Sequence, residues 1–244
     1  MNVTEEVKTL CEKARLAAPA VALAGDERRN AALIAAAESL AEHTGEILAA
    51  NEKDLAAAME NGVPAVMLDR LRLDETRVRA MADALRALTA LPDPTARTET
   101  WERPSGLTIT RAHVPLGVVA IIYEARPNVT ADAAGLCLKS GNVAVLRGGK
   151  EAIHSNKAIV AAIRGAIVPL GFPAESVSLV ESTERESAVA LMHARGLVDV
   201  LIPRGGKGLI RSCVENATVP VIETGAGNCH VYVDAAADLA GALA

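Results

Sequence analysis

The amino-acid sequence predicts an α/β fold in which N-terminal helices precede a parallel sheet that carries helices on both faces. From Pro115 onward, short apolar runs alternate with segments of helical periodicity. Strands that are buried on both faces of a parallel sheet have such continuous Val, Ile and Leu runs. Half of the 244 residues are hydrophobic, but only 2% are aromatic. Small aliphatic side chains must therefore fill the core, which favours helices packed closely on a sheet.

The first ninety residues are expected to be helical. Carboxylates at Glu5 and Glu6 suit the positive end of a helix dipole, so Thr4 is the expected cap of the first helix. Two further helical stretches are predicted by apolar periodicity and by their stop signals. They run from Asp26 to the stop at Asn61-Gly62, and from Asp74 to about Leu91.

A β-hairpin is expected between the helices and the sheet. Thr98–Glu102 and Leu107–Ala112 flank Arg103-Pro-Ser-Gly106, where proline second and glycine fourth fit a type I turn. Because a two-stranded ribbon is marginal alone, it is expected to lie on another subunit or domain.

The remaining chain is predicted to alternate strands and helices. The expected strands are Gly117–Tyr123, Val143–Arg147, Val177–Val180, Val198–Ile202, Val219–Ile222 and Cys229–Val233. The expected helices are Thr130–Lys139, Ser155–Val168, Glu184–Ala194 and Lys207–Val214, with a capping box at Thr183 and Glu186 and left-handed C-terminal caps at Gly141, Gly171 and Gly196.

Charge and cysteine usage exclude several classes of partner. The net charge is −5; residues 1–100 hold 12 basic and 17 acidic side chains, and residues 101–244 hold 13 of each. No basic stripe suits a nucleic acid, and the longest apolar run, Val114–Tyr123, is too short to cross a membrane. The four cysteines have no metal-ligand spacing. A cytoplasmic protein that binds no metal, membrane or nucleic acid is expected.

Ligands of a parallel sheet bind beyond the carboxyl ends of its strands. Four loops are expected there, and two of them contain Arg-Gly-Gly-Lys: Arg147, Gly148, Gly149 and Lys150, and Arg204, Gly205, Gly206 and Lys207. Paired glycines let the backbone approach an anion, the amides of the following helix point at it, and two cations complete the site. A dinucleotide offers such anions in its pyrophosphate and, for NADP, its 2′-phosphate. The alternative is that each Gly-Gly pair is only a tight turn.

Three further residues are candidates for chemistry. The amide of Asn128 can donate to a developing oxyanion, or it can simply cap a helix. Glu223 closes an apolar strand, which suits a general acid/base or a nicotinamide contact, or a carboxylate bound only to loop amides. Cys229 is the one cysteine near these loops, although free cysteines are usually small core residues.

These loops resemble those of the gamma-glutamyl phosphate reductases (glutamate-5-semialdehyde dehydrogenases), a proline-biosynthesis family of the aldehyde dehydrogenase superfamily. The match extends over essentially the whole chain and is weaker in the N-terminal helices. The segments that carry it are Val114-Pro-Leu-Gly117, Ile122-Tyr-Glu-Ala-Arg-Pro-Asn-Val-Thr130, Leu138-Lys-Ser-Gly-Asn142, Leu146-Arg-Gly-Gly-Lys-Glu-Ala152, Leu201-Ile-Pro-Arg-Gly-Gly206 and Val221-Ile-Glu-Thr-Gly-Ala-Gly-Asn-Cys-His-Val-Tyr-Val-Asp234.

The resemblance implies an aldehyde-dehydrogenase-like fold and NADPH-dependent reduction of L-glutamyl 5-phosphate to L-glutamate 5-semialdehyde and phosphate. It assigns the oxyanion donor to Asn128, the adenosine-ribose contact to Arg147, the pyrophosphate turn to Gly205 and Gly206, and the general base to Glu223. Lys150 stands where NAD-preferring relatives often carry a Glu, and two cations there favour NADP, at roughly 1.5–3 kcal/mol for each charge-assisted contact. Glu124 and Arg126 are candidates for binding the substrate.

The resemblance also implies three parts of the chain: residues 1–96 as the helical part of the dinucleotide-binding domain, 97–114 as a β-hairpin oligomerisation arm, and 115–244 as a Rossmann-like core. A homo-oligomer formed through the hairpin and a functional contact with a glutamate kinase are expected.

One departure from the family is expected to matter. The family's nucleophilic cysteine lies in a Gln-Arg-Pro-Ser-x-Cys segment downstream of the Glu-Thr-Gly motif, and the 244 residues contain no such segment. The sequence therefore looks like a fragment without the catalytic domain, expected to be inactive alone. Two other hypotheses stay open: a non-catalytic nucleotide-binding or assembly module, and an acylating semialdehyde dehydrogenase with another substrate.

Overall fold

The computed structural model describes residues 2–225 and 230–242 of the chain. Its helices are α1 (Val3–Ala22), α2 (Gly25–Glu42), α3 (Thr44–Glu60), α4 (Ala65–Leu71), α5 (Glu75–Leu88), α6 (Asn128–Lys139), α7 (Ile153–Ile167), α8 (Arg185–Met192), α9 (Lys207–Asn216) and α10 (Leu239–Ala242). The strands are β1 (Thr98–Glu102), β2 (Thr108–Ala112), β3 (Val118–Tyr123), β4 (Val143–Arg147), β5 (Val177–Leu179) and β6 (Val200–Arg204).

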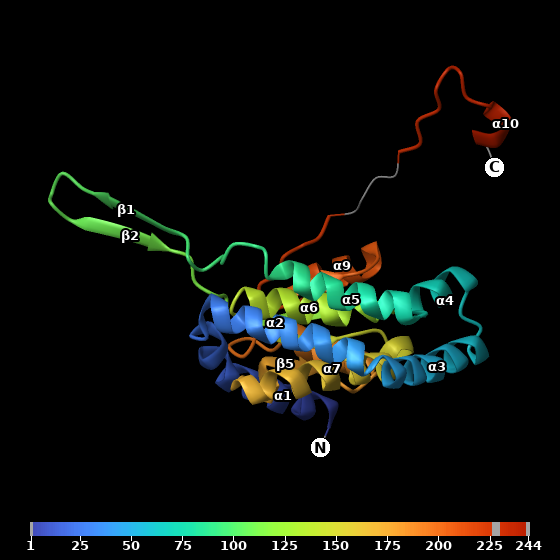
Figure 1. The fold of residues 1–244 in the computed structure, drawn as a ribbon, viewed down its shortest axis with the longest axis horizontal. Coiled ribbons are helices and arrows are strands. Elements are labelled where there is room, and N and C mark those ends of the chain that lie inside the picture. The colour runs from blue at the N-terminus through green and yellow to red at the C-terminus, as the bar shows by residue number, and fades with distance from the viewer. Residues whose placement is uncertain (1, 226–229, 243–244) are drawn as a thin grey trace.

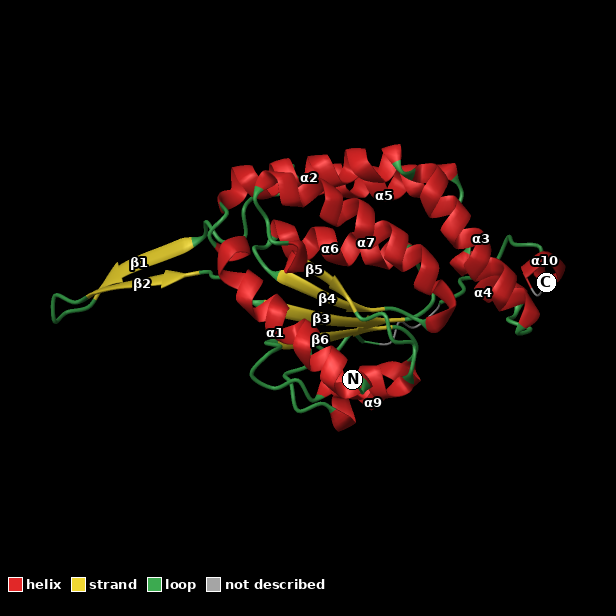
Figure 2. Cartoon of the chain, turned by 90° about the horizontal axis from the view of Figure 1, so that it is seen from below, coloured by secondary structure: helices red, strands yellow, loops and turns green. Residues whose placement is uncertain are grey.

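Strands β3 to β6 form the parallel sheet that the sequence predicts, in the order β5-β4-β3-β6. Helices α6 and α7 cover one face, and α2 and α5 form a further layer outside them (Figure 2). Helices α1 and α9 lie on the opposite face. The chain therefore has the predicted α/β architecture, with helices on both faces of a parallel sheet.

Strand β3 occupies the interior of this sheet, and all six of its residues are buried. It starts where Asp199 accepts hydrogen bonds from the amide of Val118 (2.7 Å) and from the Arg15 guanidinium (2.8 Å). A Cβ atom at Gly117 would lie 2.2 Å from the Asp199 carboxylate, and the φ of Gly117 is +115°. Only glycine fits both the short distance and the positive φ. The glycine at position 117 therefore determines where β3 begins.

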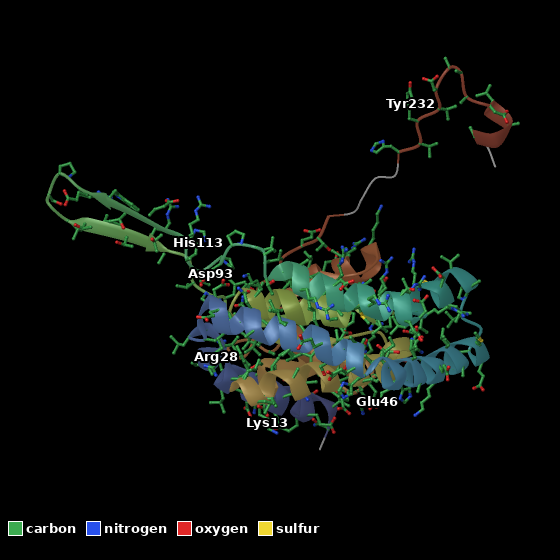
Figure 3. All side chains as sticks on the ribbon, in the orientation of Figure 1. Lys13, Arg28, Glu46, Asp93, His113 and Tyr232 are labelled. Atoms are coloured by element: carbon green, nitrogen blue, oxygen red, sulfur yellow. The ribbon has the colours of Figure 1, made fainter. Side chains whose placement is uncertain are left out.

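The hairpin of β1 and β2 stands away from the body of the molecule (Figure 1). Gly106 donates to the carbonyl of Arg103 (2.9 Å), as the predicted turn requires. The segment leading into the hairpin is held by Asp93, which accepts from the buried Arg29 guanidinium of α2 at 3.0 Å. Figure 3 shows Asp93 and His113 where the hairpin joins the body.

Three details of the helical predictions are wrong. Asn2 caps α1 by accepting from the amide of Glu5 (2.8 Å), while Thr4 lies inside the helix and donates to Glu186. The long second helix is interrupted at His43, whose ring nitrogen contacts the carbonyl of Ser39 at 2.8 Å. Helix α4 follows Pro64 and was not predicted.

The predicted capping box at Thr183 and Glu186 is also absent from the described chain. The N-cap of α8 is Glu184, without a side-chain cap, and the Glu186 carboxylate accepts from Thr4 of α1 instead of from the start of its own helix. The predicted left-handed glycines at helix ends are confirmed at Gly141 (φ +74°) and Gly171 (φ +80°). Gly196 also has a positive φ, +83°, but it does not cap α8, which ends at Met192 with His193 as its C-cap.

Two predicted strands are not strands in the described chain. In Val219–Ile222, only Val221 makes an isolated parallel bridge, with Leu201 of β6. In Cys229–Val233, residues 230–233 form neither helix nor strand, and Cys229 lies outside the described residues. In the described residues, no helix combines the length and apolar character that crossing a membrane requires.

Candidate functional site

The loops that follow β3, β4 and β6 lie side by side because the three strands are parallel neighbours. Ile122 of β3 pairs with Arg147 of β4, and Tyr123 pairs with Arg204 of β6. The loop after β3 is therefore flanked by both Arg-Gly-Gly-Lys turns. The strand order changes direction at β3, and the crevice at such a switch point is where α/β sheets bind ligands.

A cavity of about 820 Å³ opens at this switch point, between β3, β6 and α6. Six of the predicted site residues line it: Glu124, Arg126, Asn128, Arg204, Gly205 and Gly206. Its inner part is apolar, with Val119 and Ile121 of β3 and Ile202 of β6 among the lining residues. The other predicted residues, Arg147, Gly148, Gly149, Lys150 and Glu223, do not line it.

The second Gly-Gly turn presents a backbone donor to an anionic oxygen. The amide of Gly206, the N-cap residue of α9, donates to Oε1 of Glu124 at 2.7 Å. A Cβ atom at Gly205 would lie 2.7 Å from Cδ of Glu124. The carboxylate therefore occupies the position that an external anion would take at this helix start.

The first Gly-Gly turn is packed against the protein itself. A Cβ atom at Gly148 would lie 2.2 Å from Nδ2 of the buried Asn156, and one at Gly149 would lie 2.9 Å from the backbone nitrogen of Ala125. Tight packing alone thus requires both glycines. The same four letters have different surroundings in the two loops.

The cations of the first turn also differ from each other. Arg147 is half-buried and donates to the carbonyls of Thr183 (3.1 Å), Glu184 (3.2 Å) and Gly148 (3.1 Å). Burial lowers its pKa, and Glu151 acts in the opposite direction. Lys150 is exposed, and within the described part of the chain it forms no ion pair. Arg147 thus holds the loop after β5, while Lys150 is available to a ligand.

Glu223 is exposed in the loop after the bridge at Val221. This loop is attached to β6 by Thr224, which donates to the carbonyl of Pro203 at 3.1 Å. Residues 226–229, including Cys229, lie outside the described residues.

Asn128 begins α6 and has a carboxylate neighbour that sequence reasoning missed. Its Nδ2 donates to Oδ2 of Asp132 at 3.2 Å, one helical turn further on. Burial raises the pKa of Asp132, partly offset by this hydrogen bond. The spacing of four residues on a helix that starts near Asn128 was the available signal. Arg70 lines the same cavity, but it lies on the unpredicted α4 and had no such signal.

The three described cysteines are buried thiols. Burial raises the pKa of Cys11 and of Cys137 to about 12, with Glu12 adding to the effect at Cys11, and burial also raises the pKa of Cys213. A thiolate is the reactive form of cysteine, so none of the three is suited to nucleophilic catalysis. Across residues 2–225 and 230–242, no cluster of His, Cys, Asp and Glu is arranged to hold a metal ion.

Comparison with known proteins gives a consistent result. Residues 2–244 match the model of the aldehyde dehydrogenase family. The gamma-glutamyl phosphate reductase of Moorella thermoacetica is 56% identical over 240 residues, which are 98% of this chain and 57% of that protein. Among solved structures, the gamma-glutamyl phosphate reductase of Thermotoga maritima matches with a TM-score of 0.90 at 44% identity, over 97% of this chain and 57% of that one.

The similarity extends to a eukaryotic relative. The gamma-glutamyl phosphate reductase of Saccharomyces cerevisiae matches with a TM-score of 0.81 at 28% identity, over 91% of this chain and 56% of that one. The chain thus spans less than three fifths of the length of these relatives.

The buried thiols lead to a testable expectation. At pH 7.5, iodoacetamide should alkylate Cys11, Cys137 and Cys213 in the folded chain about 100-fold more slowly than in the chain unfolded in guanidinium chloride, because burial blocks both ionisation and access. Peptide mass spectrometry at each site measures the rates. Rapid alkylation of Cys137 in the folded chain would contradict its assignment as a structural residue.

Proposed function

The chain belongs to the aldehyde dehydrogenase family, and from that premise we propose that it forms the cofactor-binding part of a cytoplasmic reductase of proline biosynthesis. The reaction is the NADPH-dependent reduction of L-glutamyl 5-phosphate to L-glutamate 5-semialdehyde and phosphate. The observation that carries the proposal is the pairing, in one crevice, of an anion-binding backbone amide at Gly206 with the amide side chain of Asn128. The names of the relatives at 56% and 44% identity support the choice of substrate.

The residues around the crevice fit a dinucleotide. The Gly206 amide donates to Oε1 of Glu124 at 2.7 Å, so a pyrophosphate oxygen of the cofactor would take the place of this carboxylate. Gly205 leaves room for that approach because it has no Cβ. Arg204 borders the same turn. When bound, the nicotinamide cofactor supplies the hydride.

Preference for NADP over NAD is assigned to the first turn. The exposed ammonium group of Lys150 would bind the 2′-phosphate, and Arg147 would contribute positive charge beside the ribose. Gly148 and Gly149 keep this turn close to the loop after β3, against Ala125 and the buried Asn156. Gly148 and Gly149 thus shape the turn through their packing against the protein, and they need not contact the cofactor themselves.

Asn128 is assigned as the oxyanion donor. One N–H of its amide is held by Asp132, which leaves the second N–H to the carbonyl oxygen of the substrate as negative charge develops there. Removing such a donor typically lowers the rate by about 10²–10³-fold. Glu223 is assigned as the general base that withdraws a proton from the attacking thiol.

The nucleophile is assigned to a cysteine outside the 244 residues. Its thiolate attacks the acyl phosphate carbon and expels phosphate, leaving a thioester. Hydride addition to the thioester carbon and departure of the thiolate give the aldehyde. The described cysteines are buried, and burial keeps the thiols of Cys11 and Cys137 protonated. We therefore propose that the chain has no reductase activity by itself.

The three expected parts of the chain keep their assignments in this proposal. Residues 1–96 and 115–244 form the dinucleotide-binding domain, and residues 97–114 form an oligomerisation arm. Most side chains of β1 and β2 are exposed, Trp101 among them, and a two-stranded ribbon of this kind gains stability by packing on a partner. A functional contact with a glutamate kinase is part of the same proposal.

A chimera tests the proposed reaction. Residues 1–244 are fused to the part of the Moorella thermoacetica relative that follows its matching segment, and NADPH oxidation is followed with L-glutamyl 5-phosphate. We expect activity within about tenfold of the intact Moorella protein and none from residues 1–244 alone. Asn128→Ala should lower the activity of the chimera about 10²–10³-fold. A soluble, folded chimera that binds NADPH but leaves glutamyl phosphate unreduced would contradict the proposal.

Cofactor choice is tested separately by Lys150→Glu. The substitution replaces attraction of the 2′-phosphate by repulsion, so the Kd for NADPH should rise about 10–100-fold, equivalent to the roughly 1.5–3 kcal/mol of a charge-assisted contact. The Kd for NADH should change less than threefold. Calorimetry measures both, with Arg103→Glu at the exposed tip of the hairpin, away from the body of the molecule, as the control for net charge. Equal losses for the two cofactors would remove Lys150 from the 2′-phosphate site.

A further inference from the structure

A second cavity, of about 380 Å³, lies where α4, α5 and the start of α6 meet. It shares four lining residues with the larger cavity at the switch point: Arg70, Arg126, Asn128 and Asp132. The two cavities therefore meet at Asn128, the residue assigned to the reacting carbonyl. The remaining wall is partly charged, with Asp69, Arg72 and Arg77, and partly apolar, with Leu73, Ala80 and Met81.

The charged groups of this cavity divide into paired and unpaired ones. Arg77 pairs with Asp69 at 2.9 Å and donates to the carbonyl of Arg72 at 2.7 Å. For Arg70, the one side-chain contact in the described chain is with the sulfur of Met67 at 3.8 Å. The guanidinium of Arg126 has no hydrogen-bond or ion-pair partner among the described residues. Two guanidinium groups thus border the shared space without a carboxylate partner.

Asp132 is the complementary group. It is half-buried in the same wall and, within the residues described, accepts only from Asn128, at 3.2 Å. Neither Arg70 nor Arg126 forms an ion pair with it, although all three line both cavities. Burial raises the pKa of Asp132, so the ionised carboxylate opposes folding at neutral pH. The Asp132 carboxylate is therefore retained at a cost to the stability of the fold. It does not contact the two arginines that line the same cavities, so the space between these side chains is bordered by both negative and positive charge.

An α-amino acid carries a carboxylate and an ammonium group on one carbon, which matches such a gap. In a glutamyl chain, two methylene groups separate this carbon from the reacting carbonyl, an extended distance of about 4 Å. Four residues of helix, about 6 Å along the axis of α6, separate Asn128 from Asp132. A substrate whose carbonyl oxygen contacts Asn128 therefore places its α-carbon within reach of Asp132 and the two arginines.

We propose that Arg70 and Arg126 bind the α-carboxylate of the substrate and that Asp132 binds its α-ammonium group. The inference rests on the proposed function and adds the residues by which the site selects a glutamyl chain over an unsubstituted acyl chain of the same length. Arginine suits this role because its planar fork binds a carboxylate through two parallel hydrogen bonds. Asp132 then has two partners, the substrate ammonium group and the Asn128 amide, and so also orients the oxyanion donor.

Binding of small probes to the 244-residue chain tests the assignment without requiring catalysis. The probes are L-glutamate, glutarate, which lacks the ammonium group, and 4-aminobutyrate, which lacks the α-carboxylate. Backbone amide NMR titrations give each Kd. We expect L-glutamate to bind at least tenfold more tightly than either analogue, with the largest shifts at the start of α6.

Variants separate the two charges. Asp132→Asn should weaken L-glutamate binding at least tenfold and leave glutarate unchanged, whereas Arg126→Met should weaken L-glutamate and glutarate and leave 4-aminobutyrate unchanged. Arg86→Met on the outer face of α5, where Arg86 pairs with Asp83, is the control and should change nothing. The Tm of Asp132→Asn at pH 7 should equal or exceed that of the wild type, whereas a purely structural role for Asp132 would lower it.

Several results would overturn the inference. Equal Kd values for the three probes, or no saturable binding of L-glutamate, would do so. The same would follow if Asp132→Asn and Arg126→Met both kept the wild-type preference for L-glutamate over the two analogues. Inorganic phosphate is the remaining probe: if it competes with L-glutamate and its binding is lost in Arg126→Met, the arginines bind the phosphoryl group and the assignment is wrong. Preserved discrimination in a chimera that does not reduce glutamyl phosphate would contradict the proposed function alone. An active chimera with non-discriminating variants would contradict the inference alone.

Discussion

The position of β3 in the middle of the parallel sheet determines where the candidate site residues lie. Because β3 is buried on both faces and pairs with β4 on one side and β6 on the other, the loops after these three strands must be neighbours. Asp199 and the obligatory glycine at position 117 fix the start of this strand. The contact between Glu124 and the Gly206 amide joins two of the loops across the switch point. Residues separated by about eighty positions in sequence are thereby brought within hydrogen-bonding distance.

The two Arg-Gly-Gly-Lys turns show how far identical letters can differ in their physical role. Gly148 is required because Asn156 packs against it. Gly205, in contrast, faces the Glu124 carboxylate, whose flexible side chain can move aside. Paired glycines flanked by cations predict that another group lies close to the backbone. The pattern does not show whether that group belongs to the protein or to a ligand. That distinction depends on tertiary packing.

Much of the fold could be predicted from sequence because its signals are local. The apolar run of β3, the turn at Gly106 and the start of a helix near Asp74 each depend on neighbouring residues, and the structure has all three. The break between α2 and α3 was missed because it depends on how His43 contacts the preceding turn. The residues proposed for the cofactor could be singled out from sequence because strand ends bring them together. Arg70 and Asp132 were missed because they face the cavity from helices, where a charged residue normally indicates a solvated surface.

We propose that the crevice between β3 and β6 binds the cofactor's pyrophosphate at the Gly206 amide, in the place taken by Glu124. A titration of the ¹⁵N-labelled chain with NADPH tests this most directly, because it reports on each backbone amide. The account predicts that the largest saturable shifts occur at Gly205, Gly206 and Glu124. Saturable binding that leaves the Gly206 amide resonance unchanged would contradict it.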